Sequence, residues 1–152
     1  MAEVTHRSYR PADRAACLAI FDSNVPKYLA AEEREDFDAS LSKINADDRP
    51  TIVFVEEGFI LACGGLIFQR EKRHARFSWG LVHGQRHGEG HGTRLTELRL
   101  ALAQTEPGID SVGLATTQKT YRFFERFGFV TIGVTPDSVA PGLDQYDMVV
   151  QL

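Results

Sequence analysis

Three glycines at alternate positions, Gly88, Gly90 and Gly92, lie directly before an amphipathic run in the stretch V-H-G-Q-R-H-G-E-G-H-G-T-R-L, Val82–Leu95. Glycine tolerates positive φ and lets another group approach the backbone closely. The first turn of a helix leaves N–H groups without internal partners, so a helix start is a ready anion site. The stretch therefore predicts an anion site. A tight turn without a ligand is the alternative. Two glycines would suffice for such a turn, and the third favours a backbone without side chains that a ligand can approach closely.

Two common phosphate-binding motifs fit this stretch poorly. A nucleoside-triphosphate loop requires a lysine directly after its glycines, and none follows Gly92. The dinucleotide fingerprint G-x-G-x-x-G places its third glycine one position later than here, although Asp110 lies near the distance expected of a ribose-binding acid. The chain also lacks the repeated βαβ units of that fold. A nicotinamide-binding domain therefore remains only a rival hypothesis, which rests on the two alternate glycines and Asp110.

The elements that must position these glycines are predicted from hydrophobic spacing and from helix and strand breakers. Helices are expected after Asp13, over 31–44, directly after the glycines, and over 119–127. Strands are expected at 4–10, on both sides of the Glu57-Gly58 turn, and at 75–82, 111–115, 130–134 and 146–152. The order predicts an α/β (α+β) chain with one domain over residues 1–152. Its central mixed, mostly antiparallel sheet is flanked by about four helices, with one parallel crossover through the glycine-led helix.

Two motifs resemble those of a known family. H-G-E-G-H-G, His87–Gly92, is similar to the (Q/R)-x-x-G-x-(G/A) pyrophosphate loop of the GNAT superfamily of acyl-coenzyme A-dependent N-acetyltransferases. Y-R-F-F-E-R-F-G-F, Tyr121–Phe129, resembles the family's F-Y-E-x-x-G-F helix and following strand. The order of elements fits too, so the resemblance covers nearly the whole chain. It implies a GNAT-like fold, acetyl-CoA as acyl donor, and acetyl transfer to a primary amine.

The resemblance also implies which residues hold the cofactor. Backbone N–H groups of the loop, aided by the helix dipole, would bind the pyrophosphate, and the preceding strand would hold the pantetheine arm. A backbone N–H near Leu81 or Val82 would meet the oxyanion. Arg86 and Arg94 flank the loop and could bind phosphates or be ordinary surface arginines. The expected cofactor-binding residues are Leu81, Val82, His83, His87, Gly88, Glu89, Gly90, His91, Gly92, Thr93, Arg94 and Phe124.

The chain departs from the family pattern at two positions. His87 opens the loop where Gln or Arg is usual, and its charge depends on pH. Phe124 stands where the family often has the tyrosine that protonates the leaving thiol, and a phenyl ring cannot donate a proton. We nominate Tyr121, one turn earlier on the same helix, as the stand-in acid, although a structural tyrosine is an equal alternative. Phe124 also keeps open a rival function, a non-catalytic acyl-CoA-binding module.

The acceptor side is less defined by the sequence. An acidic cluster at 32–38 reads either as a solvated helix face or as a surface that steers a cationic amine. We nominate Glu33 as a catalytic base, with a histidine acting through water as the alternative. Asn24 and Tyr28 are the nominated substrate-binding residues. The acceptor itself is expected to be a small-molecule amine or a protein N-terminus or lysine.

Other features of the sequence restrict the partners. His83, His87 and His91 recur every fourth residue, but the interleaved glycines argue against a helix there, so we predict no metal site. Seventeen Lys and Arg against 21 Asp and Glu, a formal charge of -4, argue against nucleic acid. The absence of a long apolar run or signal-peptide pattern, with two distant cysteines, predicts a cytoplasmic protein without a membrane anchor. An open sheet edge near the C-terminus favours a homodimer.

Overall fold

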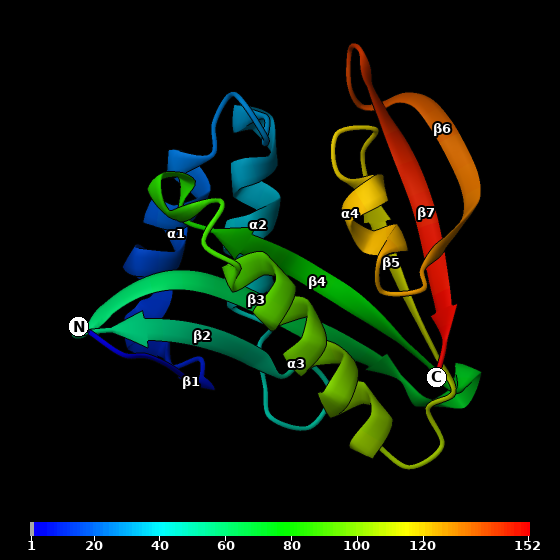
Figure 1. The fold of residues 1–152 in the computed structure, drawn as a ribbon, viewed down its shortest axis with the longest axis horizontal. Coiled ribbons are helices and arrows are strands. Elements are labelled where there is room, and N and C mark those ends of the chain that lie inside the picture. The colour runs from blue at the N-terminus through cyan, green and yellow to red at the C-terminus, as the bar shows by residue number, and fades with distance from the viewer. Residues whose placement is uncertain (1) are drawn as a thin grey trace.

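A seven-stranded sheet with the order β1-β2-β3-β4-β5-β7-β6 forms the centre of the protein in the computed structural model, which describes residues 2–152 (Figure 1). The strands are β1 (Val4–Ser8), β2 (Thr51–Glu56), β3 (Phe59–Gln69), β4 (His74–Val82), β5 (Ser111–Thr116), β6 (Val130–Ala140) and β7 (Leu143–Gln151). The helices are α1 (Arg14–Ser23), α2 (Arg34–Leu41), α3 (His91–Thr105) and α4 (Tyr121–Glu125). Within residues 2–152, no helix combines the length and apolar character needed to cross a bilayer.

Helices cover both faces of the sheet. α1 and α2 enclose one core cluster against β2, β3 and β4, and α3 and α4 enclose the clusters on the opposite face. The strand β3 is buried from Ile60 to Leu66 without interruption, because side chains on both of its faces meet helices. Its apolar run therefore lacks the alternation of a strand with one face in water.

The β4–β5 junction is the one parallel pairing among the described strands, and it is short. Only His74–Arg76 of β4 pairs with Ser111–Gly113 of β5. β4 then continues to Val82 and β5 to Thr116 without further pairing to each other, so the two strands diverge toward the start of α3 (Figure 1). This divergence leaves one edge of β4 open in the middle of the sheet.

The predicted order of elements is confirmed, and the differences lie at their ends. The Glu57-Gly58 turn has both residues at positive φ, 51° and 80°, as a tight hairpin requires. The helix expected over 31–44 is a 3-10 turn followed by the shorter α2. The last two strands are longer than predicted, since β6 continues through Pro136 to Ala140. A proline is tolerated there because β6 is an edge strand, whose outward N–H groups need no partner.

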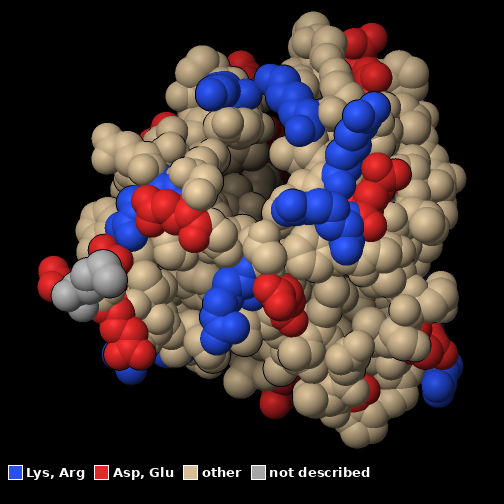
Figure 2. Space-filling view, in the orientation of Figure 1, with Lys and Arg blue, Asp and Glu red and all other residues tan. Residues whose placement is uncertain are grey.

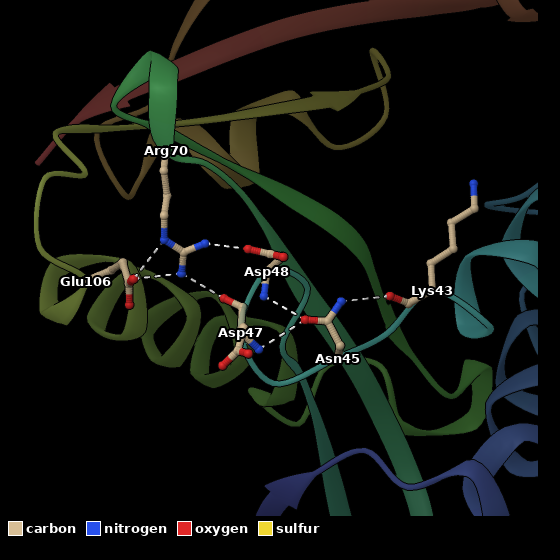
Figure 3. A network of polar contacts seen from close by, with 6 residues as sticks. All are labelled: Lys43, Asn45, Asp47, Asp48, Arg70 and Glu106. Atoms are coloured by element: carbon tan, nitrogen blue, oxygen red, sulfur yellow. Dashed lines mark hydrogen bonds and ion pairs between the residues drawn. The ribbon is translucent and has the colours of Figure 1, made fainter.

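A polar network fixes the far end of α3 (Figure 3). Arg70, directly after β3, contacts Asp48 Oδ1 at 2.5 Å, Glu106 Oε1 at 2.8 Å and the Asp47 carbonyl at 2.8 Å. Asn45 Oδ1 accepts the N–H groups of Asp47 and Asp48 at 3.1 and 2.7 Å. Exposed pairs contribute little singly, but Arg70 joins three segments and so helps to set the direction of α3. The charge of Arg70 is thus matched by carboxylates within the fold.

Candidate active site

The glycine loop is exposed and leads directly into α3. Gly88 and Gly90 have φ of 83° and 90°, and a Cβ on either would meet nothing within 4 Å. Gly90 is the N-cap residue of α3 and has no side chain that could accept a hydrogen bond. The first N–H groups of this 15-residue helix therefore face outward. Gly92 differs, because it lies inside the first turn, where a Cβ would be 3.7 Å from Cζ of Phe123. The loop has the backbone geometry of an anion site.

The charges beside the loop are partly matched within the fold. Arg86 bonds both oxygens of Glu56 at 3.0 and 3.1 Å and both oxygens of Glu89 at 3.0 Å. These hydrogen bonds lower the pKa of each carboxyl and raise the pKa of Arg86. Glu89 also accepts from Nε2 of His91 at 3.1 Å. Arg94 is exposed and pairs with no carboxylate in residues 2–152, so it is the loop cation available to a phosphate.

A hollow lies on this face between the end of β4 and α4, with Lys and Arg side chains on its rim (Figure 2). Sequence reasoning missed two cations here, Arg122 within α4 and Arg126, the C-cap residue of α4. The Cζ atom of Arg126 lies 4.9 Å from the centroid of the Phe123 ring, and Phe123 is the side chain that faces Gly92. The two arginines are four residues apart within the predicted helix 119–127, and this spacing indicates that both lie on the same helix face.

The open edge of β4 presents the Val82 N–H. His83 N–H donates to the Leu61 carbonyl of β3 at 2.8 Å, whereas the Val82 carbonyl accepts from Asn24 Nδ2 at 3.0 Å and from His87 Nε2 at 2.9 Å. The N–H and C=O of one strand residue point to the same side. Val82 N–H therefore points away from β3, toward the side that β5 leaves unpaired. A backbone donor thus faces the divergence, close to the glycine loop.

A β-bulge in β4 lies directly before this donor. Cys63 pairs with Leu81 and Gly65 with Ser78, so two residues of β4 oppose the single residue Gly64. One of the two is Trp79, with φ of 46°. Its ring centroid lies 5.2 Å from that of Phe37, and it packs against the core cluster beside α1 and α2. The bulge bends β4 where it leaves β5.

The end of α1 is joined to the loop at two points. Asn24 is 4% exposed, and its Nδ2 donates to the carbonyls of Ile20 at 2.8 Å and Val82 at 3.0 Å. Ser23 Oγ accepts the Gly84 N–H at 2.8 Å, and a Cβ at Gly84 would overlap the Ser23 carbonyl oxygen. Asn24 thus holds the Val82 peptide in place. Sequence reasoning missed Gly84, whose nearest partner is 61 positions away.

Of the two remaining acceptor-side residues, Tyr28 is joined to Asn24, because its N–H donates to the Asn24 carbonyl at 2.9 Å. Tyr28 is 39% exposed, and its ring centroid is 4.8 Å from that of His87, so it borders the loop. Glu33 Oε2 accepts the Ala30 N–H at 2.9 Å and thereby caps the turn before α2. The structure brings Tyr28 to the loop and shows a capping contact for Glu33.

The two aromatic positions of α4 have different surroundings. Tyr121 stacks on Tyr146 at 4.5 Å, and its hydroxyl oxygen accepts from Arg122 Nε at 3.1 Å. Phe124 is half-buried and packs edge-on against Phe77 and Phe129. Phe124 thus faces the core cluster that β4 shares with α4.

The three regularly spaced histidines turn to separate partners. Nδ1 of His83 accepts the Gln85 N–H at 3.2 Å, whereas His87 and His91 bond Val82 and Glu89. Throughout residues 2–152, no three His, Cys, Asp or Glu side chains are grouped as metal ligands.

A sheet that opens between β4 and β5, beside a bare helix N-terminus, is the framework of a coenzyme A-dependent acyltransferase. The family model described as the acetyltransferase (GNAT) family matches residues 17–129, and the chain belongs to this family. Acetyl-CoA is the acyl donor of such enzymes, and both the expected fold and the expected family are confirmed.

Solved structures repeat this architecture over the whole chain. A candidate phosphinothricin N-acetyltransferase is 22% identical, with a TM-score of 0.83 and 99% of each chain covered. A ribosomal-protein-alanine N-acetyltransferase from Brucella melitensis is also 22% identical, with a TM-score of 0.78 and coverage of 97% of this chain and 99% of that one. An aminoglycoside 6'-N-acetyltransferase complexed with coenzyme A is 15% identical, with a TM-score of 0.76 and coverage of 97% and 96%. The comparison with curated protein sequences found no match.

Proposed function

We propose that this protein transfers the acetyl group of acetyl-CoA to a primary amine by direct attack on the thioester. The observation that carries the proposal is the free Val82 N–H at the open edge of β4, close to the bare N-terminus of α3. One site would thus hold both the pyrophosphate and the reacting carbonyl of the donor.

Each part of the donor meets a matching group. The N–H groups around Gly88, Gly90 and the first turn of α3 would bind the pyrophosphate, and Arg94 would add a positive charge. The pantetheine arm would lie along β4 in the gap that β5 leaves. The remaining loop residues, His83, His87, Glu89, His91, Gly92 and Thr93, would line this path, with Leu81 and Phe124 at its inner end.

The reaction needs a neutral amine, a stabilised oxyanion and a thiolate that can leave. The amine nitrogen forms a bond to the thioester carbonyl carbon, the Val82 N–H stabilises the developing oxyanion, and the C–S bond then breaks. The nitrogen of the tetrahedral intermediate loses a proton to the base, and the departing thiolate takes up a proton from the acid, so that an amide and free coenzyme A result. Glu33, or a histidine through water, is our candidate base, and Tyr121 is our candidate acid. The hydroxyl of Tyr121 accepts from Arg122, which leaves its own proton available for donation.

The acceptor follows from the chemistry only as a class. Structurally similar proteins are named for acceptors as different as aminoglycosides and a ribosomal-protein alanine. A small-molecule amine and a protein N-terminus or lysine both fit an attack on an exposed thioester. We propose that Asn24 and Tyr28 contribute to the binding of the acceptor. We also propose that the protein is a homodimer and that it is located in the cytoplasm.

The competing function is an acyl-CoA-binding module without transfer activity, favoured by the phenyl ring of Phe124 at the usual acid position. Thermal unfolding with acetyl-CoA, coenzyme A or NADH tests the ligand first. A donor at about a hundred times its Kd should stabilise the fold by roughly 2.7 kcal/mol, a shift of several degrees for a chain of this size. A shift with NADH alone would contradict the proposal. Release of coenzyme A on addition of amines then separates the transferase from the binding module.

A further inference from the structure

Arg99 of α3 is a buried arginine without a counter-charge. It is 2% exposed, and no carboxylate pairs with it in the described part of the chain. Its Nη1 donates to the Gly65 carbonyl at 3.3 Å, whereas its Nε is buried without any partner. Burial lowers its pKa to about 9, so the guanidinium still carries its charge at neutral pH. Four of its five N–H groups have no acceptor within residues 2–152.

The guanidinium lies over the bulge of β4. A Cβ on Gly80 would overlap Nη2 and lie 3.1 Å from Cζ of Arg99, and a Cβ on Gly64 would lie 3.3 Å from the same Cζ. Its Cζ also lies 3.8 Å from the centroid of the Phe77 ring. Two strands thus omit side chains where the guanidinium lies. Nη1 is directed to β3 and Nη2 to β4, the strand with the open edge.

Such an arrangement is costly unless an anion completes it. An uncompensated buried charge strongly destabilises a fold, and one long hydrogen bond with one aromatic contact offsets only part of this cost. The fold supplies no acceptor to Nε within residues 2–152. A guanidinium presents its donors in a plane that matches a carboxylate.

We propose that Arg99 binds the terminal carboxylate of a dicarboxylic acyl group, so that the enzyme takes succinyl-type acyl-CoA donors in addition to acetyl-CoA. This inference rests on the proposed function, because it uses Val82 N–H as the site of the thioester carbonyl. Gly80 precedes Val82 by two residues, about 6.6 Å along a strand. A four-carbon diacyl group reaches about 5 Å from its thioester carbon to its carboxylate oxygens. A hydrogen bond of about 2.9 Å at each end adds to this reach, so the group is long enough to join the Val82 N–H to Nη2.

The transfer itself would balance as for acetyl. The amine nitrogen bonds to the thioester carbon, the C–S bond breaks, and the coenzyme A thiolate takes up the proton that the amine loses. The distal carboxylate stays intact and remains on the product. Arg99 would therefore act by selecting and orienting the donor.

The test compares two donors with the same four-carbon skeleton, succinyl-CoA and butyryl-CoA, together with acetyl-CoA. Their Kd values are measured by isothermal titration calorimetry with the full chain and without an amine, so no turnover occurs. We expect succinyl-CoA to bind at least about tenfold more tightly than butyryl-CoA, since a hydrogen bond to a charged group contributes at least that ratio. Arg99→Met should abolish the preference, and Arg99→Lys should retain part of it. Arg73→Met, which removes a remote exposed arginine, should leave the ratio unchanged.

The outcomes separate this inference from the proposed function. Equal affinities for succinyl-CoA and butyryl-CoA in the unmodified protein would overturn the inference, while tight binding of acetyl-CoA would leave the proposed function standing. Equal weakening of all three donors by Arg99→Met would also overturn it, because Arg99 would then only support the bulge. Failure of all three to bind would overturn both. Should Arg99→Met not fold, the comparison of donors in the unmodified protein decides alone.

Discussion

Replacing Gly90 with alanine isolates the role of the loop from its contribution to stability. Gly90 has φ of 90° and open space around it, so the new methyl group meets no protein atom within 4 Å. An L-residue in this region costs about 1–2 kcal/mol, and the lower entropy of the unfolded chain returns about 0.4–1 kcal/mol. The net loss of about 1 kcal/mol should lower the unfolding midpoint by about 2–4 °C.

Gly108 is the matched control for this substitution. Its φ is 84°, and a Cβ there would make only an ordinary contact of 3.9 Å with Arg73. It follows the far end of α3, about 22 Å from the loop at 1.5 Å per residue over 15 residues. Gly108→Ala should therefore destabilise the fold by the same amount as Gly90→Ala.

The two variants should differ in their affinity for acetyl-CoA. A methyl group at Gly90 would stand where a pyrophosphate approaches, and loss of one hydrogen bond to a charged group costs about 1.5–3 kcal/mol. Calorimetry should therefore give a Kd raised at least about tenfold for Gly90→Ala and unchanged within about twofold for Gly108→Ala. Equal affinities in the two variants would refute the placement of the pyrophosphate on this loop.

Three further predictions concern the framework and the chemistry. Gly84→Ala should cost about 1–3 kcal/mol in unfolding free energy, measured in urea, because its Cβ would overlap the Ser23 carbonyl oxygen; an unaltered midpoint would contradict the packing. The hydrogen bond from Arg7 lowers the pKa of Asp13, so this carboxylate stabilises the fold above pH 4 and that stability is lost as pH falls through the lowered value. Asp13→Asn should thus lower stability by about 2 kcal/mol at pH 7 and flatten its decline below pH 5, and an unchanged pH profile would count against the pair. Tyr121→Phe should lower kcat about tenfold or more with little change in KM if Tyr121 is the acid, whereas an unchanged kcat ends that nomination.

Local rules were sufficient to predict the loop and most of the fold. The sequence places Gly58, Gly88 and Gly90 in turns or directly before a helix, and each of the three has positive φ. These positions depend on a few neighbouring residues, so a single sequence carries their signal. The order of elements followed from periodicity in the same way.

Features that depend on distant partners could not be predicted. Asn24 bonds Val82, 58 positions away, and that contact fixes the donor peptide of the candidate site. Arg99 lies at a helical position that reads as polar and exposed, yet Gly64 and Gly80 admit its guanidinium into the core. No local pattern in the sequence links these residues, because their contact arises only when α3 packs on the sheet.

The chemistry of transfer is the most direct test of the central claim. The purified chain is incubated with acetyl-CoA and, separately, with a small amine, a polyamine, an aminoglycoside and a peptide with a free N-terminus. Free thiol is followed over time and the acceptors are analysed by mass spectrometry. The account predicts release of coenzyme A that depends on one of these amines, matched one to one by its acetylated product. Tight binding of acetyl-CoA with no amine-dependent thiol release from any class would contradict it and leave a binding module.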